Sequence, residues 1–204
     1  MENIILQYGA RSRRSEKGMG EVAMNDIHPD LERVLISTEP IQARVKELAD
    51  QISRDFSEVE RLYIVGILKG AFIFLADLTR QLNVPHVVDF MALSSYGRTT
   101  DSGAVRILMD LREPIESQHI MIVEDIVDTG NTLHYLHQVL RGRNPASLHT
   151  CALVRKKRDQ VGVTLDYLGF EIPNVWVVGY GLDYADRYRT LPFVAELKSE
   201  VYTG

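Results

Sequence analysis

The sequence has one cysteine, no long apolar run and no strong excess of charge of either sign. Cys151 has no second cysteine to pair with inside the chain, which favours a reducing compartment, the cytoplasm. Its apolar surroundings, 148–154, predict a buried structural thiol rather than a nucleophile. No run of about 18 apolar residues occurs, so we expect no membrane span. The net charge of −5 argues against broad contacts with nucleic-acid phosphates.

Internal repeats and low-complexity segments are also missing from the 204 residues. This length suits one compact domain with a small appended part. Residues 1–25 lack the apolar core of a signal peptide, so we expect a solvated, disordered tail. We expect residues 26–204 to form the folded domain.

Helical and strand patterns alternate along the chain. Apolar residues from Ile41 to Phe56 recur at spacings of three and four, which predicts a helix over 39–56 with Thr38 as its cap. Similar patterns predict helices over 71–82 and 130–140. Apolar runs rich in strand formers predict strands over 62–68, 86–93, 105–109, 119–123, 148–154 and 175–178. This order predicts an α/β fold with a parallel core sheet flanked by helices, and ligands beyond the carboxyl ends of the strands.

The segment after the fourth predicted strand carries the strongest chemical signal. Three carboxylates, Glu124, Asp125 and Asp128, come just before a small polar turn that opens a helix, 129–132. Like charges so close together cost free energy unless a ligand or metal uses them. The turn offers hydroxyls and backbone N–H groups at a helix N-terminus, which suits a phosphate. The carboxylates suit sugar hydroxyls or a metal; a capped turn without a ligand is the alternative.

The string Val-Glu-Asp-Ile-Val-Asp-Thr-Gly at 123–130 resembles the phosphoribosyl-pyrophosphate signature of type I phosphoribosyltransferases, in the form typical of the hypoxanthine/guanine branch. Leu68-Lys69-Gly70 resembles the pyrophosphate loop of that family, and 88–90 with 94–97 its mobile active-site loop. Segments 169–173, 177–184 and 187–189 resemble its purine-binding region. The resemblance covers most of residues 35–193. It implies the type I fold, with a small hood made from the two ends of the chain.

The resemblance implies a purine-salvage transferase that makes IMP or GMP and pyrophosphate from phosphoribosyl pyrophosphate and hypoxanthine or guanine. It assigns Asp128 as the general base or acid at purine N7, and Mg²⁺ to Glu124, Asp125 and Asp183. It assigns the binding of phosphoribosyl pyrophosphate to Lys69, Gly70, Ser95, Tyr96, Glu124, Asp125, Thr129, Gly130, Asn131, Thr132 and Arg189.

The same resemblance places Trp176 as a ring that stacks on the purine, although its alternation with Val175 and Val177 also fits a core position. Val177 and Asp183 join it in the purine site. The base-reading lysine is found by counting. Counting forward from Glu124 selects Lys156, and counting back from Gly169 selects Arg155. We favour Lys156, because the strand over 148–154 anchors the forward count.

Two other classes of protein stay open. An RNA-binding regulator on the same fold would need a basic face, which the acidic balance does not favour. An unrelated nucleotide-binding protein with a similar turn would not explain the match at 179–189. The resemblance also implies a homodimer or homotetramer, with no nucleic-acid or membrane partner.

Overall fold

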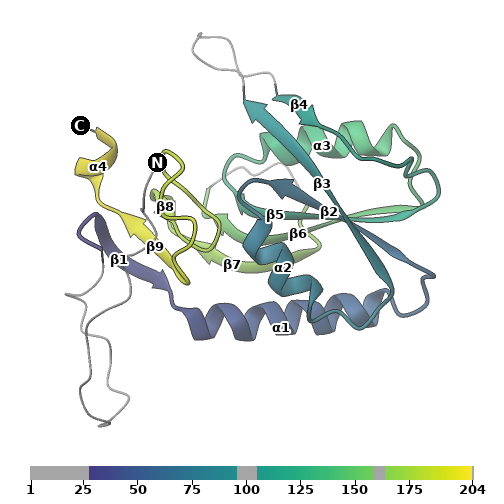
Figure 1. The fold of residues 1–204 in the computed structure, drawn as a ribbon, viewed down its shortest axis with the longest axis horizontal. Coiled ribbons are helices and arrows are strands. Elements are labelled where there is room, and N and C mark those ends of the chain that lie inside the picture. The colour runs from purple at the N-terminus through teal and green to yellow at the C-terminus, as the bar shows by residue number, and fades with distance from the viewer. Residues whose placement is uncertain (1–27, 96–104, 159–163, 204) are drawn as a thin grey trace, which may run out of the picture.

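The computed structural model describes residues 28–95, 105–158 and 164–203. Within this part of the chain the strands form a larger and a smaller sheet (Figure 1). The elements are β1 (Leu31–Ile36), α1 (Thr38–Asp55), β2 (Leu62–Leu68), α2 (Phe72–Thr79), β3 (His86–Ser95), β4 (Val105–Met109), β5 (His119–Val127), α3 (Asn131–Arg141), β6 (Ser147–Lys156), β7 (Tyr167–Ile172), β8 (Val177–Val178), β9 (Val194–Leu197) and α4 (Ser199–Thr203).

The larger sheet confirms the predicted parallel core. Its strand order is β4-β3-β2-β5-β6-β7. Each neighbouring pair runs parallel except β3 and β4, which pair antiparallel at one edge. The parallel strands therefore bring their carboxyl ends to one edge of the sheet, where a ligand site is expected.

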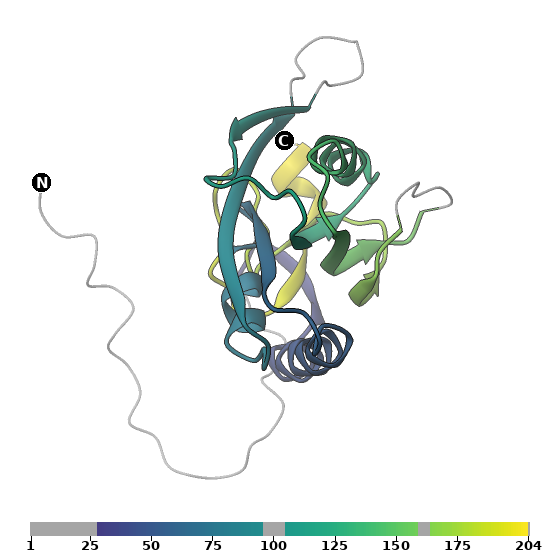
Figure 2. The same ribbon diagram turned by 90° about the vertical axis from the view of Figure 1, so that its right-hand side faces the viewer.

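Helices cover both faces of the larger sheet, with α1 and α2 on one face and α3 on the other (Figures 1 and 2). Successive side chains of β2 point to opposite faces, so Ile64 belongs to the same buried cluster as Phe74 of α2, and Val65 to the same buried cluster as Leu136 of α3. All four side chains are fully buried. Truncating such a side chain to alanine typically costs about 2–5 kcal/mol. This packing makes the sheet a rigid base for the loops at its carboxyl edge.

The start of α1 differs from the prediction. The helix begins at Thr38, but the Thr38 hydroxyl donates a 3.1 Å hydrogen bond to the carbonyl of Pro192 instead of capping the helix. Ser37, the N-cap residue, also makes no side-chain capping bond. A contact with a distant segment has taken the place of the local cap, and it ties α1 to the chain just before β9.

The smaller sheet joins the two ends of the described chain. Its order is β1-β9-β8, with both pairs antiparallel. The sequence patterns did not predict β1, β7, β9 or α4, and the strand predicted over 175–178 shrinks to Val177–Val178. β1 and β9 pair over a long chain separation, such as Leu31 with Leu197, so local periodicity carries little signal for them.

Three strands of the larger sheet run further than predicted, and one of them is β3, which ends at Ser95 rather than at residue 93. β5 continues from Val123 to Val127, and β6 continues from Val154 to Lys156, because Ile126 pairs with Val154 and Val127 with Arg155. The residues of the predicted site on these strands are therefore held by sheet hydrogen bonds rather than by loops.

Cys151 lies on β6 and is fully buried, as predicted. Burial raises the pKa of its thiol, which keeps it protonated and unreactive. Among the described residues, none of the helices is both long and apolar enough to cross a membrane.

Candidate active site

A cavity of about 260 Å³ lies where β2, β3 and β5 end, under the loop that leads into β9. Its lining contains residues predicted for the site from four separate parts of the sequence. These are Lys69, Gly70, Glu124, Asp125, Thr132, Asp183 and Arg189. A hollow of about 530 Å³ beside His119 and His149 is larger, but none of the predicted residues lines it. We therefore place the site by its chemistry rather than by cavity size.

The turn after β2 packs tightly against the acidic end of β5. The Leu68–Lys69 peptide bond is cis. A Cβ atom on Gly70 would lie 1.7 Å from Oδ2 of Asp125, so this position has no room for a side chain. A Cβ on Gly181, whose φ is +104°, would lie 2.0 Å from the Gly70 carbonyl. Gly70 therefore lets the turn lie against the Asp125 side chain of β5, and Gly181 lets the loop before β9 lie against the backbone of the turn.

Glu124 and Asp125 form a buried acidic pair on β5. The pKa of Glu124 lies well above its ordinary value because burial removes the carboxyl from water, and the neighbouring Asp125 raises it further. Burial also raises the pKa of Asp125. Within the part of the chain that the structure describes, Oε2 of Glu124 is buried and has no hydrogen-bond partner. Such an oxygen is costly unless a hydroxyl donor or a cation meets it.

The acidic pair fits a magnesium ion. The described residues contain no group of three His, Cys, Asp or Glu side chains close enough to enclose a metal. Mg²⁺ does not require such a cage, because it usually takes one or two carboxylates and completes its shell with substrate phosphates and water. The unpartnered Oε2 of Glu124 and the nearby Asp125 carboxylate would supply hard oxygen ligands of this kind. Asp183 lines the same cavity from the opposite loop.

Asp128 lies just after β5 and contacts the end of β6. Lys156 Nζ donates a 3.0 Å hydrogen bond to Asp128 Oδ2, and the lysine side chain is only 12% exposed. Arg158 Nε lies 2.6 Å from Asp128 Oδ1 and forms an ion pair with it. The two atoms are not aligned for a hydrogen bond, and Oδ1 has no hydrogen-bond partner among the described residues. Arg155 instead donates a 2.6 Å hydrogen bond to Glu171 on β7. Adjacent strand residues point to opposite sides, so the structure brings Lys156 to Asp128 and turns Arg155 away.

The polar turn between β5 and α3 has the shape of an anion site. Gly130 precedes α3 with a φ of +81°, a left-handed conformation that suits glycine. The backbone N–H of Asn131 donates to Thr129 Oγ1 at 3.4 Å. The first N–H groups of a helix lack partners inside the helix, so those of α3 face the space beyond β5. Thr129, Asn131 and Thr132 have exposed side chains there.

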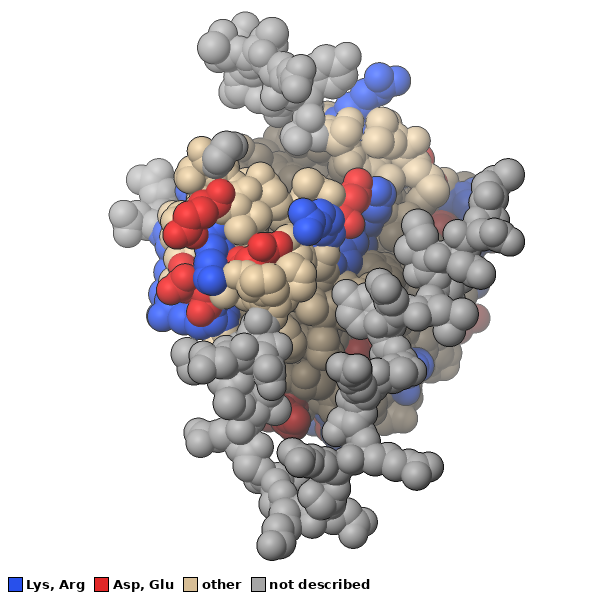
Figure 3. All heavy atoms as spheres, turned by 60° about the vertical axis from the view of Figure 1, so that its left-hand side comes forward, with Lys and Arg blue, Asp and Glu red and all other residues tan. Residues whose placement is uncertain are grey.

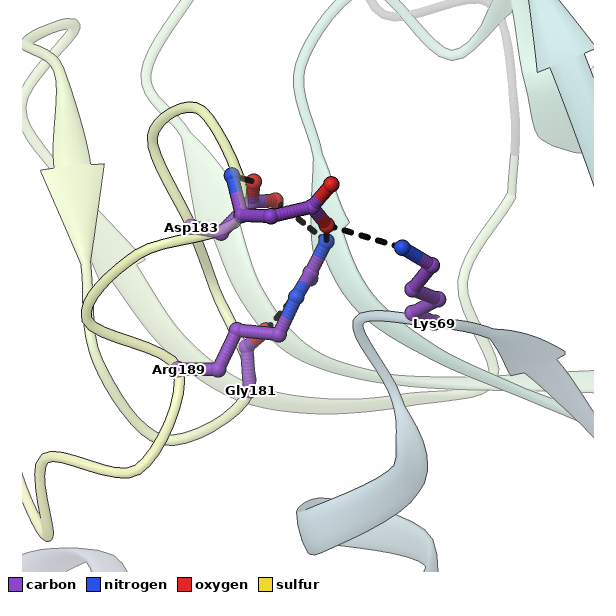
Figure 4. A network of polar contacts seen from close by, with 5 residues as sticks. Lys69, Gly181, Asp183 and Arg189 are labelled. Carbon is purple, nitrogen blue, oxygen red and sulfur yellow. Dashed lines mark hydrogen bonds and ion pairs between the residues drawn. The ribbon is translucent and has the colours of Figure 1, made fainter. Parts of the chain in front are cut away.

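The loop before β9 contributes a network of charges (Figure 4). Arg189 Nη2 lies 2.8 Å from Asp183 Oδ1, and Nη1 donates to the Gly181 carbonyl at 2.9 Å. Lys69 reaches across from the β2 turn to Asp186 Oδ1 at 2.9 Å. Sequence reasoning did not select Asp186 or Arg158. Asp186 lies between two matched segments and Arg158 lies two residues after Lys156, but only the contacts distinguish them from ordinary surface charges.

Trp176 does not occupy a core position, because its side chain is 45% exposed. Its ring stacks on Tyr202 of α4, with centroids 5.2 Å apart and planes at 23°, and meets Tyr184 edge to face at 5.6 Å. Val177 is buried in β8. Ser95 is the last residue of β3, and Tyr96 lies outside the described residues.

The chain is similar to known proteins over most of its length. The family described as the phosphoribosyl transferase domain matches residues 35–185. The hypoxanthine-guanine phosphoribosyltransferase of Dictyostelium discoideum is 48% identical, covering 83% of this chain and 97% of that protein. The Bacillus subtilis enzyme of the same name is 45% identical, covering 85% of this chain and 97% of that protein.

Solved structures agree. A hypoxanthine phosphoribosyltransferase from Staphylococcus aureus superposes with a TM-score of 0.82 and 40% identity, covering 87% of this chain and 97% of that one. A Trypanosoma cruzi hypoxanthine phosphoribosyltransferase variant complexed with IMP gives a TM-score of 0.80 at 44% identity, covering 86% and 94%. The chain therefore belongs to the phosphoribosyl transferase family, in the branch of the hypoxanthine-guanine phosphoribosyltransferases.

Proposed function

We propose that this enzyme joins hypoxanthine or guanine to phosphoribosyl pyrophosphate and releases IMP or GMP with pyrophosphate. The observation that carries the proposal is the contact between Lys156 and Asp128 at the carboxyl edge of the sheet, 3.0 Å apart. It puts a proton acceptor and an ammonium donor side by side. A 6-oxopurine presents N7 and its 6-oxo group on one edge, so both protein groups can reach it together.

Asp128 is the proposed general base. Its carboxylate takes the proton from N7 while N9 forms a bond to the anomeric carbon of the ribose. The bond from that carbon to pyrophosphate breaks, and its electron pair leaves with the pyrophosphate oxygen. Proton transfer of this kind contributes typically about 10²–10⁴-fold to the rate. In the reverse direction the protonated Asp128 returns the proton to N7.

Lys156 is the proposed reader of the base. Its ammonium has three donors and no acceptor, so it pairs with a 6-oxo group and not with the amino group of adenine. The 45% exposed ring of Trp176 offers a stacking surface for the purine. Val177 would contribute backbone groups to the base edge, and Asp183 would complete the purine site from the loop before β9.

The remaining residues bind phosphoribosyl pyrophosphate in this proposal. The turn Thr129-Gly130-Asn131-Thr132 holds the 5′-phosphate at the N-terminus of α3. Glu124 and Asp125 accept hydrogen bonds from the ribose hydroxyls, while Lys69, Gly70 and Arg189 hold the pyrophosphate. Ser95 and Tyr96 would belong to the loop that covers it. Mg²⁺ bound at Glu124, Asp125 and Asp183 would supply positive charge for the leaving pyrophosphate.

The RNA-binding alternative finds no support. It needs a continuous basic face, but the net charge is −5. The face seen in Figure 3 carries acidic and basic side chains interleaved with uncharged ones. An oligomer, dimer or tetramer, and a cytoplasmic location stay part of our proposal. Light scattering on the purified protein at several concentrations would give the subunit number.

A base panel tests the proposed function directly. Protein, Mg²⁺ and phosphoribosyl pyrophosphate are mixed with hypoxanthine, guanine, xanthine or adenine separately, and nucleotide formation is followed by absorbance. We expect rapid conversion of hypoxanthine or guanine and almost none of adenine. Efficient use of adenine would overturn the assignment of base, and failure with every base would overturn the proposed function.

A further inference from the structure

Asp186 joins two cations of the pyrophosphate site with a single carboxylate oxygen. Its Oδ1 accepts from Lys69 Nζ at 2.9 Å and from Arg189 Nη2 at 3.1 Å (Figure 4). Lys69 comes from the turn after β2, and Arg189 from the loop before β9. The segments that carry the two cations already pack together through Gly70 and Gly181, which would leave Lys69 and Arg189 as like charges close to each other. Like charges so close together favour an anion between them, and here the Asp186 side chain supplies it.

The backbone holds the Asp186 carboxylate in this position. Ala185 and Asp186 both have left-handed conformations, with φ of +51° and +61°. The Asp186 N–H donates to Asp183 Oδ2 at 2.7 Å, and Tyr184 and Arg187 bridge the turn. The side chain itself is 68% exposed, so packing does not fix it. The pKa of Asp186 lies below its ordinary value, first because Lys69 donates to the carboxylate and then because Arg189 does.

We propose that Asp186 is an internal stand-in for pyrophosphate: it occupies Lys69 and Arg189 in the free enzyme and must release them before the pyrophosphate group binds. The inference rests on the proposed function, because it takes these two residues as the pyrophosphate contacts. Asp186 thereby lowers the affinity of the site for phosphoribosyl pyrophosphate and for the pyrophosphate product.

The exchange is physically easy. Ion pairs between exposed side chains are weak because water and salt screen them, and the Lys69 and Asp186 side chains are each 68% exposed. The Arg189 side chain is 18% exposed, but it keeps its closer ion pair with Asp183 when Asp186 leaves. Pyrophosphate carries several charges and more acceptor oxygens than one carboxylate. It therefore displaces Asp186 from Lys69 and Arg189 when it binds. Each departure of pyrophosphate is in turn assisted by the return of Asp186. The Asp186 carboxylate therefore lowers the affinity of the site for pyrophosphate and speeds the release of this highly charged product.

The test removes the negative charge of Asp186 without changing the fold. Asp186→Asn keeps the size of the side chain, and asparagine tolerates a left-handed conformation as aspartate does. Binding of inorganic pyrophosphate with Mg²⁺, and of phosphoribosyl pyrophosphate with Mg²⁺, is measured by titration calorimetry. We expect the variant to bind both about three- to tenfold more tightly, the size that follows when the exposed Lys69 pair and the partly exposed Arg189 pair stop competing. Asp186→Glu, which keeps the charge, should stay closer to the unmutated protein.

Asp50→Asn is the matched control. It removes the same charge from an exposed ion pair, with Lys46 at 2.8 Å on α1, and should leave both affinities unchanged. Unchanged or weaker binding by Asp186→Asn would overturn the inference, because a carboxylate that only positions Lys69 and Arg189 would strengthen binding rather than oppose it. Failure of the unmutated protein to bind phosphoribosyl pyrophosphate would overturn the proposed function and this inference with it.

Discussion

Lys156 and Asp128 are 28 positions apart in the chain, yet Nζ of the lysine lies 3.0 Å from Oδ2 of the aspartate. The parallel register of β5 and β6, with Val127 opposite Arg155, places the two residues at neighbouring strand ends. A donor and a proton acceptor thus share one small volume at the edge of the sheet. Neither strand alone could arrange this, and much of the proposed chemistry depends on it.

Replacement of Lys156 should alter base use selectively. Lys156→Ala removes the ammonium that pairs with the 6-oxo group, so kcat/KM for hypoxanthine should fall by about 10- to 100-fold. The KM for phosphoribosyl pyrophosphate should move far less. Arg155→Ala is the control, because Arg155 pairs with Glu171 away from Asp128. Steady-state kinetics of both variants decide the matter, and the reverse ranking would transfer the role to Arg155.

Asp128→Asn should slow the chemical step. Asparagine keeps the shape and polarity of aspartate but cannot take a proton, so kcat should fall by about 10²-fold or more. Affinity for phosphoribosyl pyrophosphate, measured by titration with the variant, should change much less. A variant that retains its full kcat would remove Asp128 from the mechanism.

Removal of Mg²⁺ should stop turnover. The leaving pyrophosphate carries a high negative charge, and the described part of the site offers it mainly Lys69 and Arg189. Excess chelator should therefore abolish nucleotide formation, and added Mg²⁺ should restore it. Activity that persists unchanged in chelator would contradict the assignment of the metal to Glu124, Asp125 and Asp183.

Glu124→Gln should stabilise the free protein while it impairs catalysis. The pKa of Glu124 is raised by burial, so the stability contributed by its protonated form is complete below the ordinary carboxyl pKa and is lost as pH rises through the raised value. Glutamine does not titrate. The Tm of the variant should match that of the unmutated protein at about pH 4 and exceed it increasingly at higher pH. Each kcal/mol by which the variant has the larger free energy of unfolding should raise Tm by about 2–4 °C.

Thermal unfolding across a pH series, without Mg²⁺ or substrate, measures this difference. Asp125 is also buried and has a raised pKa, so Asp125→Asn should shift Tm in the same direction. A Tm difference that does not change with pH would show that folding does not raise the pKa of Glu124.

Gly70→Ala should damage the site, since the new Cβ would lie 1.7 Å from Asp125 Oδ2 and force the carboxylate to move. We expect a loss of activity of at least about tenfold, with a smaller loss of stability. Gly142→Ala is the matched control. Its Cβ would meet only the carbonyls of Gln138 and Val139 at 3.5 Å, an ordinary contact, so activity should be unchanged. Equal activity of the two variants would mean that the turn has more freedom than the structure indicates.

The sequence by itself determined the class of fold and the choice of residues that we propose for the site. Buried strands of a parallel sheet are continuous apolar runs, and the amphipathic helices have a period that is visible in one chain segment, so β2, β5 and α1 were predictable. The string from Val123 to Gly130 is similarly local, because a strand end, its carboxylates and a phosphate-binding turn follow one another directly. These features depend on neighbours in sequence.

Only the tertiary structure decided which residues meet across the site. β1 and β9 are short strands that pair with each other although most of the chain separates them in sequence. No local sequence pattern therefore predicts them. The choice between Lys156 and Arg155 depended on one step of strand register, which turns a side chain to the other face. The place of Asp186 between Lys69 and Arg189 depended on a loop folding back onto a distant turn. Contacts of this kind arise from packing in three dimensions, which has no period in the sequence to reveal it.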